Sequence, residues 1–106
     1  MFVRVLTLEG IDPDKFDEFG ETAREATRPV LQSLDGYQGA VMMLDREGRR
    51  MRNAVFFESE ENVRAAEPMF ESMPERLPDG LREMVGQAER RVDVFEVIAN
   101  DRVSFG

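Results

Sequence analysis

Two short stretches with apolar residues at successive positions dominate the hydrophobic pattern of this chain. Residues 36–44 read GYQGAVMML and residues 51–58 read MRNAVFFE. Both are rich in residues that favour strands, and the polar segment 45–50 between them contains Gly48, so the pattern predicts a β-hairpin. An antiparallel hairpin usually has one face in water. Here both faces carry apolar side chains, so we expect the hairpin to need cover on both sides.

The residues before and after the hairpin predict further strands and a long helix. Residues 2–9, FVRVLTLE, and residues 90–98, RRVDVFEVI, are typical of strands. Apolar residues three and four apart predict a helix over 13–34, which Asp12 caps and Pro29 kinks near its end. The predicted buried stripe of this helix consists of Phe16, Phe19, Ala23, Ala26, Val30 and Leu34.

A second helical region follows the hairpin, with Ser59 as its predicted N-cap. Three prolines, Pro68, Pro74 and Pro78, then fall within eleven residues. Because each proline lacks an amide proton and crowds the preceding turn, we expect this region to be kinked or divided into short helices. Asp79 is the expected cap of the last piece.

The order strand, helix, strand, strand, helix, strand predicts an α+β, ferredoxin-like βαββαβ fold with a four-stranded antiparallel sheet. The chain then ends in a short tail, 99–106, whose large apolar residues are Val103 and Phe105. Right-handed crossovers place both helices on one face of the sheet. The other face, roughly 400 Å² in area, rivals the largest apolar patch of a typical monomer. We therefore expect a homodimer, in which a second copy covers that face.

Composition limits the classes of function that this chain can have. Its 106 residues, 42% hydrophobic and 34% charged, fit a single globular domain over 1–106. No apolar run approaches the roughly 20 residues of a membrane span, and no signal peptide is visible, so we expect a cytoplasmic protein without membrane contact. A net charge of −8 argues against a nucleic-acid partner.

Three missing residue types restrict the chemistry further. The chain contains no Cys, His or Trp. It therefore has no thiolate nucleophile or thiolate metal site, no imidazole base, no proximal histidine for haem and no usual transition-metal site. We expect neither a metal nor a cofactor. Catalysis would have to use carboxylates, arginines, hydroxyls, amides or the single Tyr37.

Arg4, Asn53 and Tyr37 are the candidate catalytic residues. Arg4 and Asn53 are polar residues within apolar strands, and the pleat can direct both to one face. In an enclosed cavity an arginine can hold an enolate, and an amide can bind a carbonyl or peroxide. The alternative is that both are edge or interface residues with water or carboxylate partners. Tyr37 could bind an acidic substrate, or it could simply pack on the first helix.

A methionine-rich set supplies the candidate ligand pocket, because flexible thioethers adapt to flat hydrophobic ligands. The predicted pocket residues are Met42, Met51, Phe56, Met69, Phe70 and Met73. The proline-rich stretch 67–86 could act as a lid over it. The alternative is ordinary core packing. Asp93 and Glu96 could act as bases if they were buried, although pairing with neighbouring arginines is the interpretation that we favour.

The chain resembles the antibiotic biosynthesis monooxygenase (ABM) family of the dimeric α/β-barrel superfamily. The resemblance rests on the layout, on GYQGAVMMLDRE at 36–47 and on AVFFESEENVRAAE at 54–67. It implies a dimer with a mostly apolar pocket between sheet and helices. Members of that superfamily include cofactor-free oxygenases of polycyclic aromatics, haem-degrading enzymes and isomerases. The haem degraders rely on a histidine that this chain lacks, and the oxygenases commonly present Asn, Trp, Tyr and Arg, of which Trp is missing here.

The resemblance implies cofactor-independent oxidation of an electron-rich aromatic, polyketide-like substrate, in which the substrate carbanion itself reacts with oxygen. That chemistry tolerates the missing histidine and cysteine, because the protein supplies mainly orientation and desolvation. Two alternatives stay open. One is a non-catalytic dimeric module that binds or senses a hydrophobic metabolite, and the other is a purely structural dimerisation domain.

Overall fold

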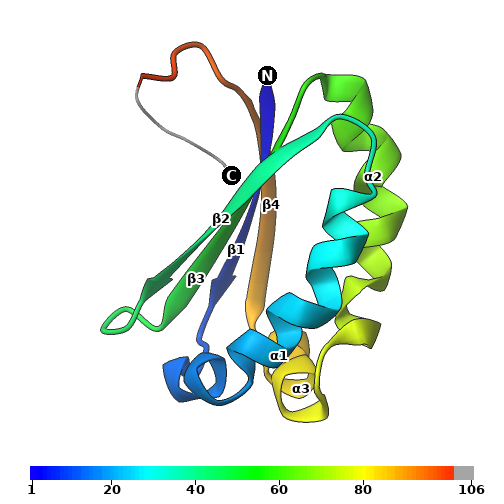
Figure 1. Ribbon diagram of the computed structural model, residues 1–106. Coiled ribbons are helices and arrows are strands. Elements are labelled where there is room, and N and C mark those ends of the chain that lie inside the picture. The colour runs from blue at the N-terminus through cyan, green and yellow to red at the C-terminus, as the bar shows by residue number, and fades with distance from the viewer. Residues whose placement is uncertain (102–106) are drawn as a thin grey trace.

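The structure, a computed structural model, describes residues 1–101, so Val103 and Phe105 of the predicted tail lie outside the described residues. The described chain has the predicted βαββαβ order, with the second helical region divided into three pieces (Figure 1). In chain order, the elements are β1 (Phe2–Glu9), α1 (Pro13–Gln32), β2 (Tyr37–Asp45), β3 (Arg50–Phe57), α2 (Glu60–Ser72), the 3₁₀ helix η1 (Met73–Arg76), α3 (Asp79–Gln87) and β4 (Glu89–Glu96).

The four strands form one antiparallel sheet in the order β2-β3-β1-β4. The first strand therefore lies at the centre between β3 and β4, as the ferredoxin-like arrangement requires. Figure 1 shows α1, α2 and α3 all on one side of the sheet, while the other side carries none of them. The predicted fold class is confirmed.

The register decides which of the alternating residues in each strand faces the helices. Leu6 pairs with Asn53 on one side and with Val92 on the other, so these three side chains share a face. Val55 and Phe57 lie on that same face and are fully buried against α2, in a cluster with Val63, Ala66 and Phe70. A second buried cluster, at the other end of the sheet, contains Leu8, Ile11 and Met51.

The face of the sheet away from the helices, here called the open face, is apolar in only one half. Val41 and Phe95 expose 37% and 55% of their surface in that half, while Met43, 46% exposed, pairs with Arg52 in the other half. Toward the other end, Thr7 lies between Arg52 and Arg91 in the register. The open face is therefore less apolar than the hairpin pattern alone indicates, because arginine replaces hydrophobic residues where β1 approaches its C-terminal end.

Helix α1 begins as predicted, with the Asp12 carboxylate accepting a hydrogen bond from the Asp14 amide at 3.0 Å. Ala23 of the predicted buried stripe is buried, but Ala26 is exposed and Gly20, which was not predicted, is buried as well. Thr27, a polar residue, faces inward in place of Ala26. It can do so because its hydroxyl donates to the Ala23 carbonyl at 2.9 Å, so no hydrogen bond is lost on burial.

The second helical region confirms the predicted N-cap and the predicted division into short pieces. The Ser59 hydroxyl accepts a hydrogen bond from the Asn62 amide at 3.2 Å, which caps α2. The prediction for Asp79 is wrong, because this residue is the first of α3 and Pro78 precedes it in extended conformation without a side-chain cap. Asp79 instead pairs with Arg82, three residues further along the same helix.

Within residues 1–101, none of the helices has the length and apolar character needed to cross a membrane.

Candidate functional site

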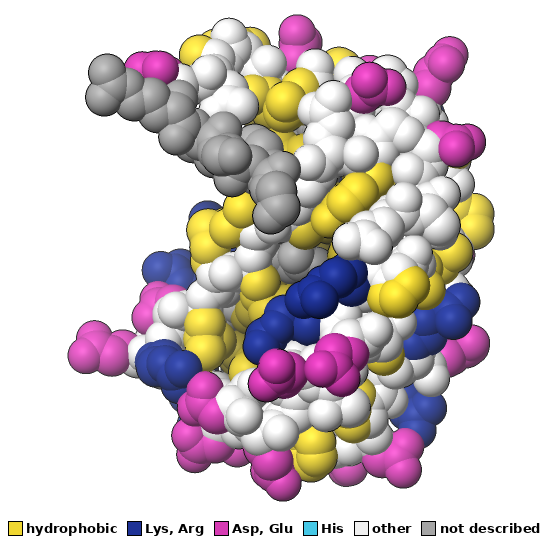
Figure 2. Space-filling model, in the orientation of Figure 1, with side chains coloured by type: hydrophobic (Ala, Val, Ile, Leu, Met, Phe, Trp, Pro, Cys, Tyr) yellow, Lys and Arg dark blue, Asp and Glu magenta, His cyan; other side chains and the backbone are white. Residues whose placement is uncertain are grey.

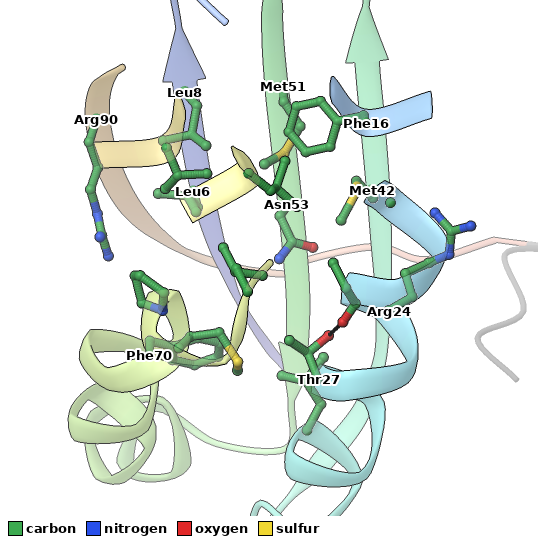
Figure 3. A pocket seen from close by; sticks show the side chains of 18 of the residues that line it. Leu6, Leu8, Phe16, Arg24, Thr27, Met42, Met51, Asn53, Phe70 and Arg90 are labelled. Atoms are coloured by element: carbon green, nitrogen blue, oxygen red, sulfur yellow. Dashed lines mark hydrogen bonds between the residues drawn. The ribbon is translucent and has the colours of Figure 1, made fainter. Parts of the chain in front are cut away.

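A cavity of about 110 Å³, here called the chamber, lies between the sheet and the helices (Figure 3). From the sheet it is lined by Arg4, Leu6, Leu8, Met42, Met51 and Asn53, with Arg90 from the edge strand β4. From the helical layer its lining includes Phe16, Ala23, Thr27, Phe70, Met73 and Leu81. Most of these side chains are apolar, as is usual for small-molecule sites, and only a few polar groups interrupt them.

Arg4 is the most deeply buried charged residue of the described chain, with 2% of its surface exposed. Its guanidinium donates to both carboxylate oxygens of Glu67 on α2, from Nε at 2.7 Å and from Nη2 at 3.4 Å. The guanidinium carbon also lies 4.0 Å from the centre of the Phe70 ring. Arg4 therefore has the carboxylate partner that the alternative interpretation gave it, and it also lies in the chamber wall.

Asn53 contributes an uncharged polar group with free hydrogen-bonding capacity to the chamber. Its half-buried side chain points into the cavity from β3 (Figure 3) and makes no side-chain hydrogen bond within residues 1–101. The hydroxyl of Thr27, which also lines the chamber, already donates to Ala23. The predicted placement of Arg4 and Asn53 on one face of the sheet is confirmed, since the pairing of β1 with β3 puts both side chains on the face that the helices cover.

A second hollow of about 440 Å³, here called the groove, adjoins the chamber along α1 and β2. The two share Arg24, Thr27, Leu31, Met42 and Asn53 in their linings, so the groove leads from the chamber to the surface. Tyr37 lines the groove and not the chamber, and it packs against the buried cluster of Val55 and Phe57. Its position fits the packing interpretation, with one side of the residue at the groove wall.

The predicted pocket residues divide into two groups. Met42, Met51, Phe70 and Met73 line the chamber. Phe56 does not, because the pleat directs it to the open face while its neighbours Val55 and Phe57 face α2. Met69 is also absent from the lining, since neighbouring residues of a helix point about 100° apart and Phe70 is the one that faces the cavity.

Two arginines of the chamber wall escaped the sequence-based prediction. Arg24 reaches the chamber from α1 and Arg90 from β4, on opposite sides of the cavity (Figure 3). Arg90 could have been found from its register, because it pairs with the inward-facing Leu8. Arg24 directly follows the buried Ala23, and the corrected stripe through Gly20, Ala23 and Thr27 would have placed it at the margin of the buried surface.

Asp93 and Glu96, the acidic residues of the last strand, are not part of the chamber lining. Asp93, considered as a buried base, forms an ion pair of 2.8 Å with Arg91 on the open face, as the favoured interpretation expected. Within residues 1–101 there is no cluster of three or more His, Cys, Asp or Glu side chains that could hold a metal ion. The chamber lining itself contains no Asp or Glu.

The fold and the cavity together define the class of protein: a ferredoxin-like α+β chain with an apolar, arginine-bordered chamber between its sheet and its helices. The model of the antibiotic biosynthesis monooxygenase family matches residues 1–67, which is more than half of the 106 residues. The chain therefore belongs to the antibiotic biosynthesis monooxygenase family. The comparison with curated proteins finds no match.

Several solved structures share the fold over nearly their whole length. A monooxygenase from the gene ActVA-Orf6 of Streptomyces coelicolor, in complex with nanaomycin D, superposes with a TM-score of 0.70 at 19% identity, covering 97% of this chain and 92% of that one. The haem degrader MhuD of Mycobacterium tuberculosis gives 0.64 at 15% identity, covering 95% and 99%. A dimeric ferredoxin-like protein from an uncultured marine organism gives 0.62 at 13% identity, covering 94% and 96%.

Proposed function

We propose that this protein binds a small aromatic, polyketide-like molecule in the chamber and oxidises it as a cofactor-independent monooxygenase. The observation that carries the proposal is the free amide of Asn53, which points into a mostly apolar cavity of a chain from the monooxygenase family. The similar protein from Streptomyces coelicolor is a monooxygenase with nanaomycin D bound, and this supports an aromatic ligand of comparable character.

The reaction balances with molecular oxygen alone. An activated CH₂ group between aromatic rings loses both hydrogens, one oxygen atom becomes the new carbonyl, and the other leaves as water. No external reductant is needed. Because no carboxylate lines the chamber, the substrate needs an acidic C–H or O–H of its own. The Asn53 amide would donate to the developing enolate or peroxide oxygen, and the apolar wall would exclude water.

Oxygen uptake with a panel of anthrones and hydroquinones tests this proposal. We expect uptake by the wild type and a loss of about 100- to 1,000-fold in kcat for Asn53→Ala, in keeping with the removal of one preorganised donor. Gln38→Ala, at an exposed position of β2, is the matched control and should keep full activity. Wild-type uptake that is unchanged in Asn53→Ala would contradict the assigned role.

The non-catalytic alternative has one observation in its favour, since Arg4 is engaged with Glu67 and the chamber offers no general base. Under that alternative, the same aromatic compounds bind in the chamber, but no oxygen is consumed with any of them. Native mass spectrometry of the purified protein, which would detect a retained ligand, separates a binding module from a purely structural domain.

We also propose that the protein forms a homodimer through the open face. Phe95, Val41 and Met43 supply exposed apolar surface there, and one of the structures with the same fold is a dimeric ferredoxin-like protein. Size-exclusion chromatography with light scattering should give a dimer for the wild type and a 12 kDa species for Phe95→Asp. A wild-type monomer at micromolar concentration would refute this assembly.

A further inference from the structure

The groove that leads to the chamber is bordered by positive charge only. Arg24 lines both hollows and Arg28 lines the groove, one turn further along α1. Neither lining contains an Asp or Glu. Acidic residues outnumber basic ones by 22 to 14 in the chain, which gives the molecule a net charge of −8. The entrance to the cavity is therefore lined by basic residues, although the protein as a whole carries a negative charge.

These two arginines are also free to bind a ligand. Neither Arg24 nor Arg28 forms a hydrogen bond or an ion pair with another side chain of residues 1–101. Arg4, in contrast, has its charge balanced by Glu67 at 2.7 Å. Five other arginines near the surface form ion pairs, among them Arg46 with Asp17 and Arg64 with Glu60, whereas Arg52, Arg76 and Arg90 form none within residues 1–101.

The local structure of α1 directs Arg24 toward the cavity. Gly20 lies one turn before it and also lines the chamber. A Cβ atom at Gly20 would lie 3.4 Å from Nη1 of Arg24, so the guanidinium lies against the space that the missing side chain leaves open. On the face of the molecule shown in Figure 2, Lys and Arg side chains near the centre of the view lie beside hydrophobic side chains and, on another side, beside Asp and Glu side chains.

We infer that the ligand of this site is an amphiphilic anion, with an apolar aromatic body in the chamber and a carboxylate or ionised phenol bound by Arg24 and Arg28 in the groove. This inference rests on the proposed binding function and adds the charge of the ligand. Guanidinium groups suit such a ligand, because their planar donors match the two oxygens of a carboxylate. Arg24 and Arg28 lie four residues apart, so they are neighbours on the helix surface and can contact one anionic group together.

A pair of probes that differ only in charge tests the inference: 2-naphthoate, an anion, and 2-naphthamide, its neutral analogue. Each is titrated into the ¹⁵N-labelled full chain, and the shifted amide signals report both affinity and location. We expect both probes to shift chamber residues such as Leu6 and Asn53, and the wild type to bind naphthoate about three- to tenfold more tightly. Raising the salt concentration should weaken only naphthoate binding, since it screens exposed charges.

The double variant Arg24→Gln/Arg28→Gln should lose the preference for naphthoate and keep its affinity for naphthamide. The control Arg64→Gln/Arg82→Gln removes the same charge from exposed positions outside both hollows and should behave like the wild type.

Three outcomes would count against the inference, and they can be told apart. If naphthamide binds in the chamber and naphthoate binds no more tightly, the inferred charge of the ligand is wrong while the binding function stands. If the preference survives the double variant and disappears in Arg90→Gln, the anion is bound from β4 and the groove assignment is wrong. If neither probe shifts chamber residues, the proposed binding function fails, and the inference fails with it.

Discussion

Replacing Glu67 by alanine should destabilise the protein more than replacing its partner Arg4 by methionine. The two side chains of this ion pair differ strongly in exposure, with 3% for Arg4 and 38% for Glu67. Loss of Glu67 leaves a guanidinium without a counter-charge in the interior. Loss of Arg4 leaves only a carboxylate that water can reach.

The exposures set the expected magnitudes. Removing one partner of a fully buried pair costs about 3–5 kcal/mol. Because Glu67 is partly hydrated, we expect the lower part of that range or slightly below it, about 2–3 kcal/mol for Glu67→Ala. For Arg4→Met we expect about 1 kcal/mol or less, because methionine keeps an apolar contact with Phe70 and removes a charge from the interior. In the Arg4→Met background, Glu67→Ala should cost about 0.5 kcal/mol or less, so the two substitutions are coupled.

Urea unfolding at one fixed protein concentration measures these values, since assembly would make apparent stability depend on concentration. Arg64→Ala breaks an exposed ion pair on the same helix and should cost no more than about 0.5 kcal/mol. The reasoning is refuted if Glu67→Ala is no more destabilising than Arg4→Met, or if the two changes are additive.

Two further predictions concern the turns that position the sheet. Gly36 and Gly10 have nearly equal positive φ angles of 75° and 76°, but a Cβ at Gly36 would lie 2.2 Å from the Asn62 side chain, whereas at Gly10 it would meet nothing within 4 Å. Thermal unfolding should therefore show Gly36→Ala to be less stable than Gly10→Ala by about 1–2 kcal/mol, and equal losses would contradict the clash. The Asp45 carboxylate accepts hydrogen bonds from the Gly48 amide, which has the larger effect, and from the Arg50 side chain. These bonds lower the pKa of Asp45 from the ordinary 3.8. The pKa of Asp45 is lower in the folded state than in the unfolded state, so its charge stabilises the fold. The stability that the wild type gains over Asp45→Asn should be fully present above pH 3.8 and should disappear as the pH falls through the lowered pKa. A difference in urea unfolding that persists unchanged at pH 2 would contradict this prediction.

The fold could be predicted from local signals because each one has a short-range cause. Asp12 and Ser59 cap the helices through amides two and three residues away. Pro74 and Pro78 fall at the starts of η1 and α3, while Pro68 lies inside α2 without ending it. The hairpin and the first and last strands, β1 and β4, follow from their own residues. The prediction for Asp79 failed because Pro78 occupies the N-cap position, where its carbonyl accepts a hydrogen bond from the Arg82 amide, so Asp79 is the first residue of the helix.

The site was harder to predict, because its lining depends on register and on hydrogen bonds that hydrophobicity does not report. Thr27 faces the chamber since Ala23 satisfies its hydroxyl, and this shifts the buried stripe of α1 and brings Arg24 to the cavity. The pairing of Arg4 with Glu67 joins residues 63 positions apart. Phe56 shows the limit most simply: its hydrophobicity suits the chamber, but the register of β3 places it on the other face.

The alternation of the central strands has a consequence for how this protein can diversify. In β1, Arg4, Leu6 and Leu8 line the chamber, while Val3, Val5 and Thr7 belong to the open face. The eight residues of β1 thus determine two properties at alternating positions, the lining of the chamber and the surface of the open face. Substitutions at even positions can retune what enters the cavity without altering the outer surface, and those at odd positions can do the reverse. A one-residue insertion in β1 would exchange the two sets at once, so this strand can tolerate replacement far more readily than a change of length.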